Sequence, residues 1–331
     1  MSDEQTSKEQ GSKEQSNGGR IRILCIDDEA RILRALRALF REHDVHVTSE
    51  PKLAIRWAKE KDIDVIVCDQ RMPQMLGVEV LREIKMVHPR AMRILLTGYS
   101  DLSAVLASVN ESEVFRFVNK PWDNEELRKT VLQAAAIARD VPLLAALPAI
   151  SEKEKDQARQ AAGVLVIEDD PDTQNRLREI LGGHYQVRFA STAERALQVL
   201  EQHETGVIIS EAETAAGDWT QLIKLLKRYH PQIPTVVITE RANAQVAIDL
   251  INEGQVYRML LKPVRMGTCR LSVESAISHY WQLKSNPQAL RRFVVAETKP
   301  SSMPSWLSAS LLNRIKMIPQ RLLGVGRAFT Q

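Results

Sequence analysis

The sequence has no long hydrophobic run, and this absence excludes a membrane-spanning helix. A helix needs about 20 consecutive apolar residues to cross a bilayer, whereas the longest apolar-rich stretch, VPLLAALPAI at 141–150, has ten. Segment 1–20 is polar and charge-mixed and contains no apolar core, so it does not form a secretory signal. We interpret it as a disordered N-terminal lead and expect a cytoplasmic protein.

Cysteine is scarce as well. The three cysteines, Cys25, Cys68 and Cys269, have neither the spacing of a metal site nor that of a disulfide framework. This pattern is typical of a protein in the reducing cytosol. Cys25 and Cys68 fall in predicted buried strands, where we interpret them as small core residues and not as redox groups.

The length and charge indicate two domains and a basic C-terminal tail. At 331 residues, the chain suits two domains of about 100 to 150 residues with some chain left over. An apolar share of 44% and a charged share of 26% are those of a soluble globular protein. Residues 284–331 carry eight Lys or Arg and one acid, Glu297, so the net charge of +3 divides into +7 there and −4 elsewhere.

The sequence contains an internal repeat of two copies. The matching segments are 22–40 with 163–181, 94–101 with 236–243, and 114–122 with 256–264, and the second copy has a single insertion before its second strand. In each copy, short β-branched runs alternate with helical patterns, which predicts a parallel sheet covered by helices on both faces. Capping-box spacings mark helix starts at Asp123 and Ser191.

Polar residues collect at one predicted edge of the first sheet. Asp27 and Asp28 end the first strand, Asp69 the third, Thr97 the fourth, and Lys120 the fifth. In a doubly wound sheet, functional side chains gather beyond the carboxyl ends of the strands. Crowded carboxylates need a cation, and an all-oxygen ligand set suits Mg²⁺. The alternative is a set of solvated strand-end acids beside a structural lysine.

These residues resemble the receiver domain of bacterial two-component response regulators. The motifs that carry the resemblance are DDE at 27–29, DQRMP at 69–73 followed by Gly77, LLTG at 95–98, and NKPW at 119–122. The resemblance implies two flavodoxin-like (βα)5 domains, each with a five-stranded parallel sheet in the order 2-1-3-4-5. We expect the domains to be the phosphoacceptor receiver at 21–140 and a degenerate receiver at 162–284, with a linker at 141–161 and a basic amphipathic tail at 285–331.

The resemblance also implies a role for each residue of the first site. Asp69 would accept a phosphoryl group from a sensor histidine kinase or phosphotransfer protein. Asp27, Asp28, Asp69 and the backbone carbonyl of Arg71 would hold Mg²⁺.

Thr97 and Lys120 would contact the phosphate, and Gly98 would leave the approach to Asp69 open. Thr97 and Phe117 would form the switch, although Phe117 taken alone reads as a core residue. The bond from Lys120 to Pro121 would be cis.

The second copy keeps part of this site. Glu168 and Asp169 align with the acidic pair, Thr239 with Thr97, and Lys262 with Lys120, while Glu211 stands at the acceptor position. Further departures are Ala215 for Pro73, Glu240 for Gly98, and Met259 for Phe117. A bulky acid at Glu240 would repel and obstruct a phosphoryl group. The second copy therefore resembles a pseudoreceiver.

The longer carboxylate of Glu211 suggests a locked domain. Its extra methylene moves the carboxylate about 1.5 Å outward, one C–C bond, toward the place of a phosphoryl group. There it would meet Lys262 and Thr239 without phosphorylation, so that only the first domain switches. The competing reading is drift after duplication, in which the site is only a relic.

The tail leaves several functions open. Apolar residues recur at helical spacing between Leu307 and Leu322 with basic residues beside them, and Pro319 interrupts the helix. This stripe could dock on a partner protein, a membrane surface or nucleic acid. The alternative is that the tail packs on the second receiver or remains disordered. We find no P-loop, no HD-type metal cluster and no GGDEF-type run, so we expect no enzyme.

The sequence thus predicts a response regulator that signals through protein–protein contacts. It does not identify the downstream partner or the oligomeric state, and a dimer is one possibility. The alternative is a transcriptional regulator that binds DNA through the basic tail. We disfavour DNA binding because no helix-turn-helix pair can be placed after residue 284. A phosphoryl hydrolase on the same acidic edge is a third reading, which lacks an identifiable base or substrate pocket.

Overall fold

The computed structural model describes residues 19–98, 110, 112–140, 151–214, 217–240, 244–293 and 308–319. Several sequence predictions lie outside these residues: nearly all of the N-terminal lead, segment 141–150 of the linker, Ala215, and both ends of the apolar stripe, Leu307 and Leu322.

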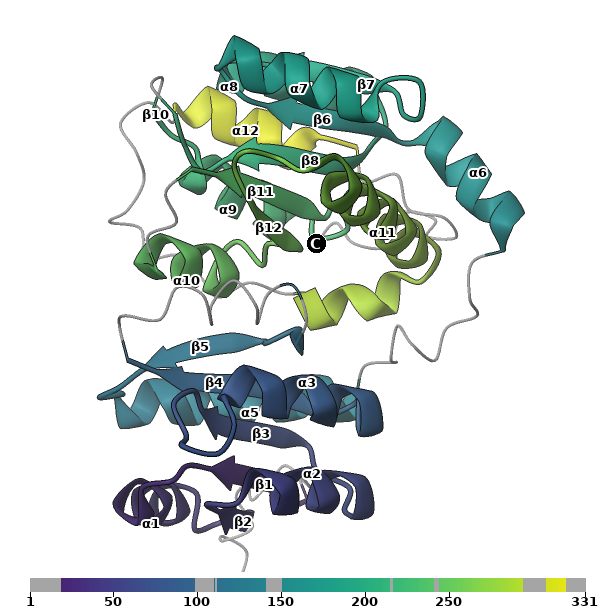
Figure 1. The fold of residues 1–331 in the computed structure, drawn as a ribbon. Coiled ribbons are helices and arrows are strands. Elements are labelled where there is room, and N and C mark those ends of the chain that lie inside the picture. Colours follow the sequence, from purple (N-terminus) through teal and green to yellow (C-terminus); the bar gives the residue numbers. More distant parts are fainter. Residues whose placement is uncertain are drawn as a thin grey trace, which may run out of the picture.

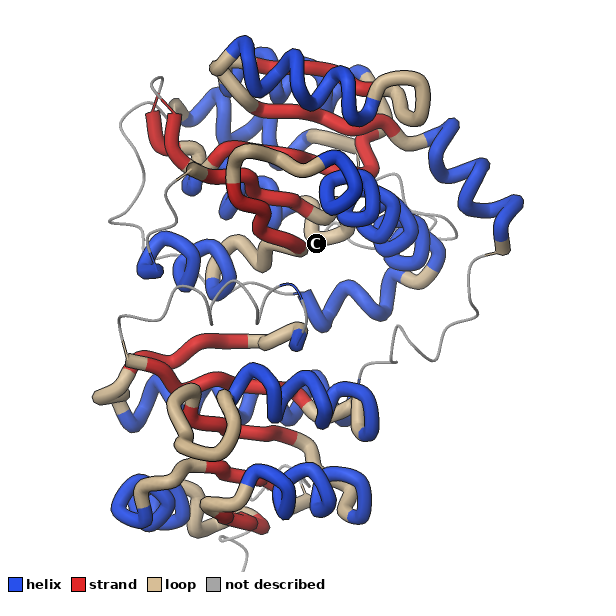
Figure 2. Tube along the Cα trace, in the orientation of Figure 1, coloured by secondary structure: helices blue, strands red, loops and turns tan. Residues whose placement is uncertain are grey.

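The first repeat forms a five-stranded parallel sheet in the order β2-β1-β3-β4-β5, as predicted. Figures 1 and 2 show its strands layered between helices in the lower half of the molecule. The strands are β1 (Arg22–Ile26), β2 (Asp44–Thr48), β3 (Val65–Asp69), β4 (Met92–Thr97) and β5 (Arg116–Asn119). The described helices are α1 (Ala30–Leu39), α2 (Pro51–Glu60), α3 (Gly77–Val87) and α5 (Asn124–Asp140).

The second repeat forms a second parallel sheet with the same order, β7-β6-β8-β11-β12. Its strands are β6 (Gly163–Ile167), β7 (Val187–Ala190), β8 (Thr205–Glu211), β11 (Thr235–Thr239) and β12 (Arg258–Leu261). Its helices are α7 (Pro171–Leu181), α8 (Ala193–Gln202), α9 (Thr220–Tyr229), α10 (Ala244–Asn252) and α11 (Met266–Ser285). The further elements are α6 (Glu152–Ala161), the antiparallel pair β9 (Glu213–Thr214) and β10 (Gly217–Asp218), the 3-10 helix η3 (Pro287–Phe293), and α12 (Ala309–Met317).

Alternating strand residues build the two core layers of the first domain. Ile23 and Cys25 of β1 belong to the apolar cluster under α1 and α5, while Leu24 and Ile26 belong to the cluster under α2 and α3. All four side chains are fully buried. Successive side chains point to opposite faces of a strand, so a parallel strand covered on both faces must be apolar throughout. This is why the apolar runs predict the sheet.

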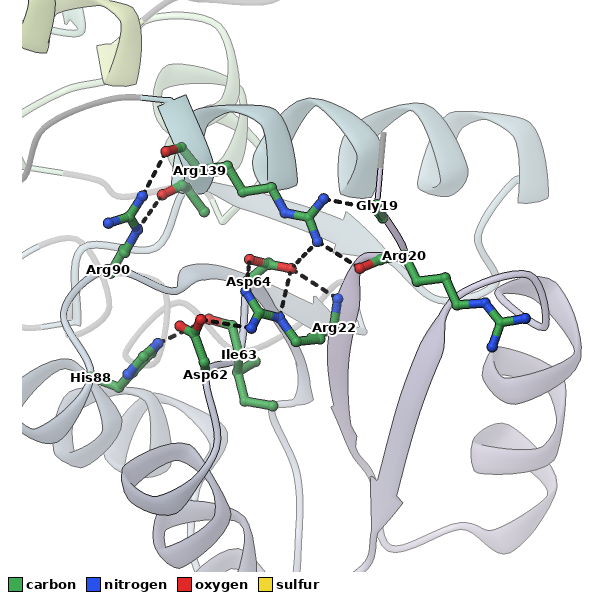
Figure 3. A network of polar contacts seen from close by, with 10 residues as sticks. Gly19, Arg20, Arg22, Asp62, Ile63, Asp64, His88, Arg90 and Arg139 are labelled. Carbon is green, nitrogen blue, oxygen red and sulfur yellow. Dashed lines mark hydrogen bonds and ion pairs between the residues drawn. The ribbon is translucent and has the colours of Figure 1, made fainter. Parts of the chain in front are cut away.

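The amino ends of the first sheet are held by ion pairs around Asp64 (Figure 3). Its carboxylate accepts from the backbone N–H of Arg22 at 2.9 Å and from Nη2 of Arg139 at 2.7 Å. Arg139 also donates to the carbonyls of Gly19 and Arg20. Burial alone would raise the pKa of Asp64, but the bonds from both arginines outweigh it and lower that pKa. This network is structural and lies away from the acidic edge.

Within the part of the chain that the structure describes, none of the helices has the length and apolar character needed to cross a bilayer.

Candidate phosphoacceptor site

The carboxyl ends of β1 and β3 bring two buried carboxylates onto one lysine. Asp27 follows β1, Asp69 ends β3, and Lys120 follows β5. Nζ of Lys120 lies 2.7 Å from Oδ2 of Asp27 and 2.5 Å from Oδ1 of Asp69. Asp27 is 0% exposed and Asp69 5%. The structure therefore brings together three of the residues that the sequence analysis singled out.

Burial and the shared ion pairs shift the protonation equilibria at this edge. Burial raises the pKa of Asp27 above its usual value, and the hydrogen bond from Lys120 opposes the rise only in part. Burial would lower the pKa of Lys120, but its bonds to Asp27 and Asp69 outweigh that effect and raise the pKa. Lys120 therefore stays charged.

The oxygen donors at this edge are of the kind that Mg²⁺ prefers, but they are not gathered into a ready-made site. Asp28 is exposed, and Asp27 and Asp69 are both engaged by Lys120. The backbone N–H of Arg71 donates to Oδ2 of Asp69 at 2.8 Å. Among the described residues, no group of three or more His, Cys, Asp or Glu is arranged to hold a metal. The donor chemistry thus fits an oxygen-bound cation such as Mg²⁺.

Two glycines shape the surroundings of Asp69. A Cβ on Gly98 would meet nothing within 4 Å among the described residues, so a side chain would have room there. A Cβ on Gly77 would lie 2.1 Å from the carbonyl oxygen of Asp69, so the close approach of α3 to β3 requires glycine. Thr97 is buried, and its hydroxyl donates to the carbonyl of Gly98 at 3.0 Å instead of reaching Asp69. The bond from Lys120 to Pro121 is cis, as predicted.

The backbone of Phe117 in β5 forms hydrogen bonds with a side chain of the second domain. The side chain of Phe117 is 3% exposed. Its backbone N–H donates to Oδ1 of Asn252 at 2.8 Å, and its carbonyl accepts from Nδ2 of Asn252 at 2.9 Å. No motif singles out Asn252. Its signal in the sequence is that another asparagine, Asn110, stands at the equivalent place of the first repeat.

The second domain repeats the lysine arrangement with glutamates. Nζ of Lys262 lies 3.0 Å from Oε2 of Glu168 and 2.7 Å from Oε2 of Glu211. Burial raises the pKa of Glu211, although the bond from Lys262 opposes it. Thr239 is also buried. The Asp169 side chain is half-buried at the same edge.

The surroundings of Glu211 differ from those of Asp69. Trp219 occupies the position of Gly77, and its backbone N–H donates to the carbonyl of Ala212 at 3.0 Å, as Gly77 does to Gln70 at 2.9 Å. Trp219 is 6% exposed and belongs to the core. Glu240, at the position of Gly98, is exposed.

The described part of the tail packs on the second domain. Leu311, Ile315 and Ile318 are buried in the same apolar cluster as residues of α8 and α9. Arg314 forms a two-pronged ion pair with Glu201, at 2.8 and 3.0 Å. Of the alternatives that the sequence left open for the apolar stripe, these residues show packing on the second receiver. A stripe already buried in this way is not a free membrane-binding face, so membrane-surface contact through Leu311 and Ile315 is not supported.

The fold and the lysine-bridged aspartates at its carboxyl edge are those of a phosphoacceptor signalling domain. A family model of the response regulator receiver domain matches residues 23–132 and 164–274. The chain therefore belongs to the response regulator receiver domain family, and it contains two copies of that domain. Receiver domains are in general signalling domains that bind Mg²⁺ at the phosphorylation site and interact with histidine kinases or phosphotransfer proteins.

Curated relatives and solved structures are similar to part of this chain. The hydrogenase transcriptional regulatory protein HoxA of Cupriavidus necator is 39% identical over 113 residues, which is 34% of this chain and 23% of HoxA. The transcriptional regulatory protein ZraR of Salmonella typhimurium is 29% identical over 164 residues, 49% of this chain and 34% of ZraR. The crystal structure of the signal receiver domain of an HD domain-containing protein from Pseudomonas fluorescens Pf-5 is 30% identical and has a TM-score of 0.36, covering 37% of this chain and 92% of that one.

These relatives correct the predicted output. The chain spans only about a quarter to a third of their length, but each is named as a transcriptional regulatory protein. The expectation of signalling through protein–protein contacts alone is therefore wrong, and the dismissal of DNA binding has no support. That dismissal relied on the lack of a helix-turn-helix pair after residue 284, which excludes one motif but not DNA contact through basic side chains.

Proposed function

We propose that this chain is a transcriptional response regulator that is switched by phosphorylation of Asp69. The observation that supports it best is the buried pair Asp27 and Asp69 bridged by Lys120, with Gly98 adding no side chain directly after β4. A carboxylate with one fixed cation is suited to attack a phosphoryl group.

Each residue of the site has a part in the transfer. An oxygen of Asp69 forms a bond to phosphorus while the P–N bond of a phosphohistidine donor breaks, and the donor imidazole keeps the electron pair. Lys120 stabilises the charge on the phosphoryl oxygens, and Thr97 must leave the Gly98 carbonyl to donate to them. Mg²⁺, held by Asp27, Asp28, Asp69 and the carbonyl of Arg71, would neutralise part of the same charge.

The second domain is proposed as a pseudoreceiver. Lys262 is held by Glu168 and Glu211, Glu240 stands where Gly98 leaves the first site open, and Trp219 replaces Gly77. The charge that a phosphoryl group would bring is already supplied by Glu211. We therefore assign the only acceptor of the chain to the first domain.

Transcriptional control is proposed to act through DNA contact by the basic tail, residues 285–331. The support is the printed function of the relatives together with the excess of basic residues in this segment. Arg314 is engaged by Glu201, so the tail's contact with DNA would fall to other basic residues, such as Arg321 and Arg327.

The test is phosphorylation and DNA binding measured on the same protein. Full-length protein with Mg²⁺ and acetyl phosphate should take up one phosphoryl group, and Asp69→Asn should take up none. Label that persists in Asp69→Asn would contradict the assignment. In gel retardation, the wild type should bind DNA with an affinity that falls steeply with salt, and Arg321→Gln/Arg327→Gln should weaken binding. No retardation at low salt would refute DNA contact and leave the labelling result standing.

A further inference from the structure

One edge strand of each sheet faces the other domain. β5 is the last strand of the first sheet, and β12 is the last strand of the second. Figure 1 shows α10 of the second domain lying between them, next to β5. An edge strand presents backbone N–H and C=O groups that no neighbouring strand satisfies. Where those groups are buried, something else must bond them.

Two asparagine side chains bond these backbone groups in the same way. Asn252, at the end of α10, accepts from the N–H of Phe117 and donates to its carbonyl, at 2.8 and 2.9 Å. Asn110 accepts from the N–H of Met259 and donates to its carbonyl, at 3.1 and 3.0 Å. A carboxamide offers one acceptor and two donors. Each asparagine therefore takes the place of one peptide group of a neighbouring strand.

The two pairs are related by the internal repeat. Asn110 and Asn252 occupy equivalent places in the two copies, and so do Phe117 and Met259. Residue i of one copy thus contacts residue j of the other, and j contacts i, which is the rule of a twofold-symmetric dimer interface. Here both halves belong to one chain. We name these four residues the asparagine clamp.

Apolar burial and further bonds surround the clamp. Phe117 and Met259 are each 3% exposed and belong to one apolar cluster that also contains Ala247 and Ile251 of α10. Arg258 donates to the carbonyl of Asn110. Hydrogen bonds in such a setting fix position, while the buried apolar surface supplies most of the energy. The contact is therefore specific as well as stable.

We propose that the second domain is a built-in substitute for a second copy of the receiver, held on the β5 face by the asparagine clamp. It occupies the surface around Phe117 that another molecule would otherwise take. Because β5 carries Phe117 shortly before Lys120, a change at Asp69 that moves this strand passes through Asn252 to the second domain. This last step rests on the proposed function, whereas the clamp itself does not.

Amide hydrogen exchange of the unphosphorylated full chain tests the clamp. In the wild type, the amides of Phe117 and Met259 should be protected, and the protection should not depend on protein concentration because the contact lies within one chain. Asn252→Ala should speed exchange at Phe117 about tenfold, and Asn110→Ala should do so at Met259, since each loses one buried hydrogen bond. Asn175→Ala, an exposed asparagine on α7, is the matched control and should change neither.

Several results would overturn the clamp. Unprotected amides in the wild type would do so whether or not the variants fold. Protection that grows with protein concentration would mean that a second copy, and not the second domain, covers β5. Unchanged exchange at both amides in the two alanine variants would show that the asparagines do not hold the strands.

Phosphorylation tests the coupling separately. Acetyl phosphate with Mg²⁺ should change exchange at Met259 several-fold in the wild type and leave it unchanged in Asp69→Asn. In Asn252→Ala, Asp69 should still be labelled, but the change at Met259 should disappear. Labelling without a change at Met259 in the wild type would refute the coupling. Absence of labelling would refute the proposed function, while the clamp would still be decided by the unphosphorylated protein.

Discussion

At the residue scale, one lysine with two acids is the motif that both domains share. Lys120 bridges Asp27 and Asp69, and Lys262 bridges Glu168 and Glu211. In both cases, burial works against the charged lysine, and the ion pairs outweigh it and raise its pKa. The acids differ in length, because each glutamate has one methylene more than the aspartate at its position. Nζ of the lysine nevertheless lies 2.5 to 3.0 Å from both acids in each domain.

Lys227 of α9 is a buried lysine whose pKa is lowered, because no ion pair to an acid offsets the effect of burial among the described residues. It is 3% exposed, its Nζ donates to the carbonyl of Pro231 at 2.7 Å, and burial lowers its pKa to about 7. An unfolded lysine has a pKa of about 10.4. Between pH 7 and about 10.4, the unfolded chain holds a proton that the native protein lacks, so stability should rise with pH in this window.

Replacing this lysine should therefore stabilise the protein. We expect Lys227→Met to raise the free energy of unfolding by on the order of 1 to 3 kcal/mol at or below pH 7, with the gain shrinking toward pH 10. Urea unfolding at several pH values measures it. Lys224→Met, on the same helix, is the contrast: Lys224 lies 2.9 Å from Glu253, and its loss leaves that acid without this partner. A wild-type stability that falls from pH 7 to 10 would contradict the argument.

The sequence predicted the residues of the first site because each ends a strand. Parallel strands that run from apolar runs into Asp27, Asp69 and Lys120 must deliver these side chains to one edge. The hydrogen bond of Thr97 could not be predicted in this way, since a hydroxyl at a strand end has several possible acceptors, of which the structure shows the carbonyl of Gly98. The asparagine at 252 was also out of reach, because its role depends on how two domains sit together.

At the element scale, the caps show what local sequence can and cannot locate. Asp123 accepts from the first-turn amides of Glu125 and Glu126, as its spacing predicted. For α8 the prediction was wrong by one residue, because the side chain of Thr192, and not that of Ser191, accepts from Arg195. Serine and threonine are both favoured N-caps, so the local sequence does not decide which of two adjacent hydroxyl residues caps α8.

The start of α3 lies against the end of β3 at Gly77, where there is no room for a side chain. Gly77 is the first residue of α3, and a Cβ there would lie 2.1 Å from the carbonyl oxygen of Asp69. Gly77→Ala should push α3 away from the end of β3, lower stability by about 1 to 3 kcal/mol, and slow labelling of Asp69. Gly267, in the first turn of α11, has nothing within 4 Å of its Cβ position and is the matched control.

The control variant should behave in the opposite way. Gly267→Ala removes freedom from the unfolded chain without a clash, so it should be neutral or stabilise by about 0.4 to 1 kcal/mol. Thermal unfolding and phosphoryl uptake of both variants measure the contrast. Equal stability of the two variants would show that α3 can shift freely and that Gly77 does not position Asp69.

The tail shows why an amphipathic pattern does not identify its partner. The spacing of Leu311, Ile315 and Ile318 correctly predicts one apolar face on a helix, and α12 buries that face on α8 and α9. His230 adds a bond of 2.6 Å between Nε2 and the carbonyl of Ile315. Periodicity reports only that a face needs cover. Whether a membrane, another protein or the same chain supplies it depends on contacts distant in sequence.

At the scale of the whole molecule, the chain combines two receiver domains whose lysine-bridged acids differ, with aspartates in the first and glutamates in the second. The two sheets share one topology and face each other through β5, α10 and β12 (Figure 1). At the position after the fourth strand, the first domain has Gly98, where a Cβ would meet nothing within 4 Å among the described residues, and the second has the exposed acid Glu240. Under the proposed function, a second domain that stays constant would give the phosphorylated first domain a fixed surface to pack against.

The ion pair of Glu211 is the feature that should keep the second domain constant. Glu211 is 4% exposed and lies 2.7 Å from Lys262, whose side chain is 12% exposed. Glu211→Ala leaves the ion pair of Lys262 with Glu168 and removes the carboxylate that, under the proposed function, takes the place of a phosphoryl group. We expect the free energy of unfolding of the second domain to fall by on the order of 1 kcal/mol, and exchange at the Met259 amide to rise in the unphosphorylated protein.

Glu240→Ala is the control for this variant. Glu240 is an exposed acid at the same edge, and its loss should change neither stability nor exchange at Met259. If Glu211→Ala leaves stability, exchange at Met259 and the response to Asp69 phosphorylation unaltered, the longer carboxylate is a relic of duplication, and the second domain is retained for its fold alone.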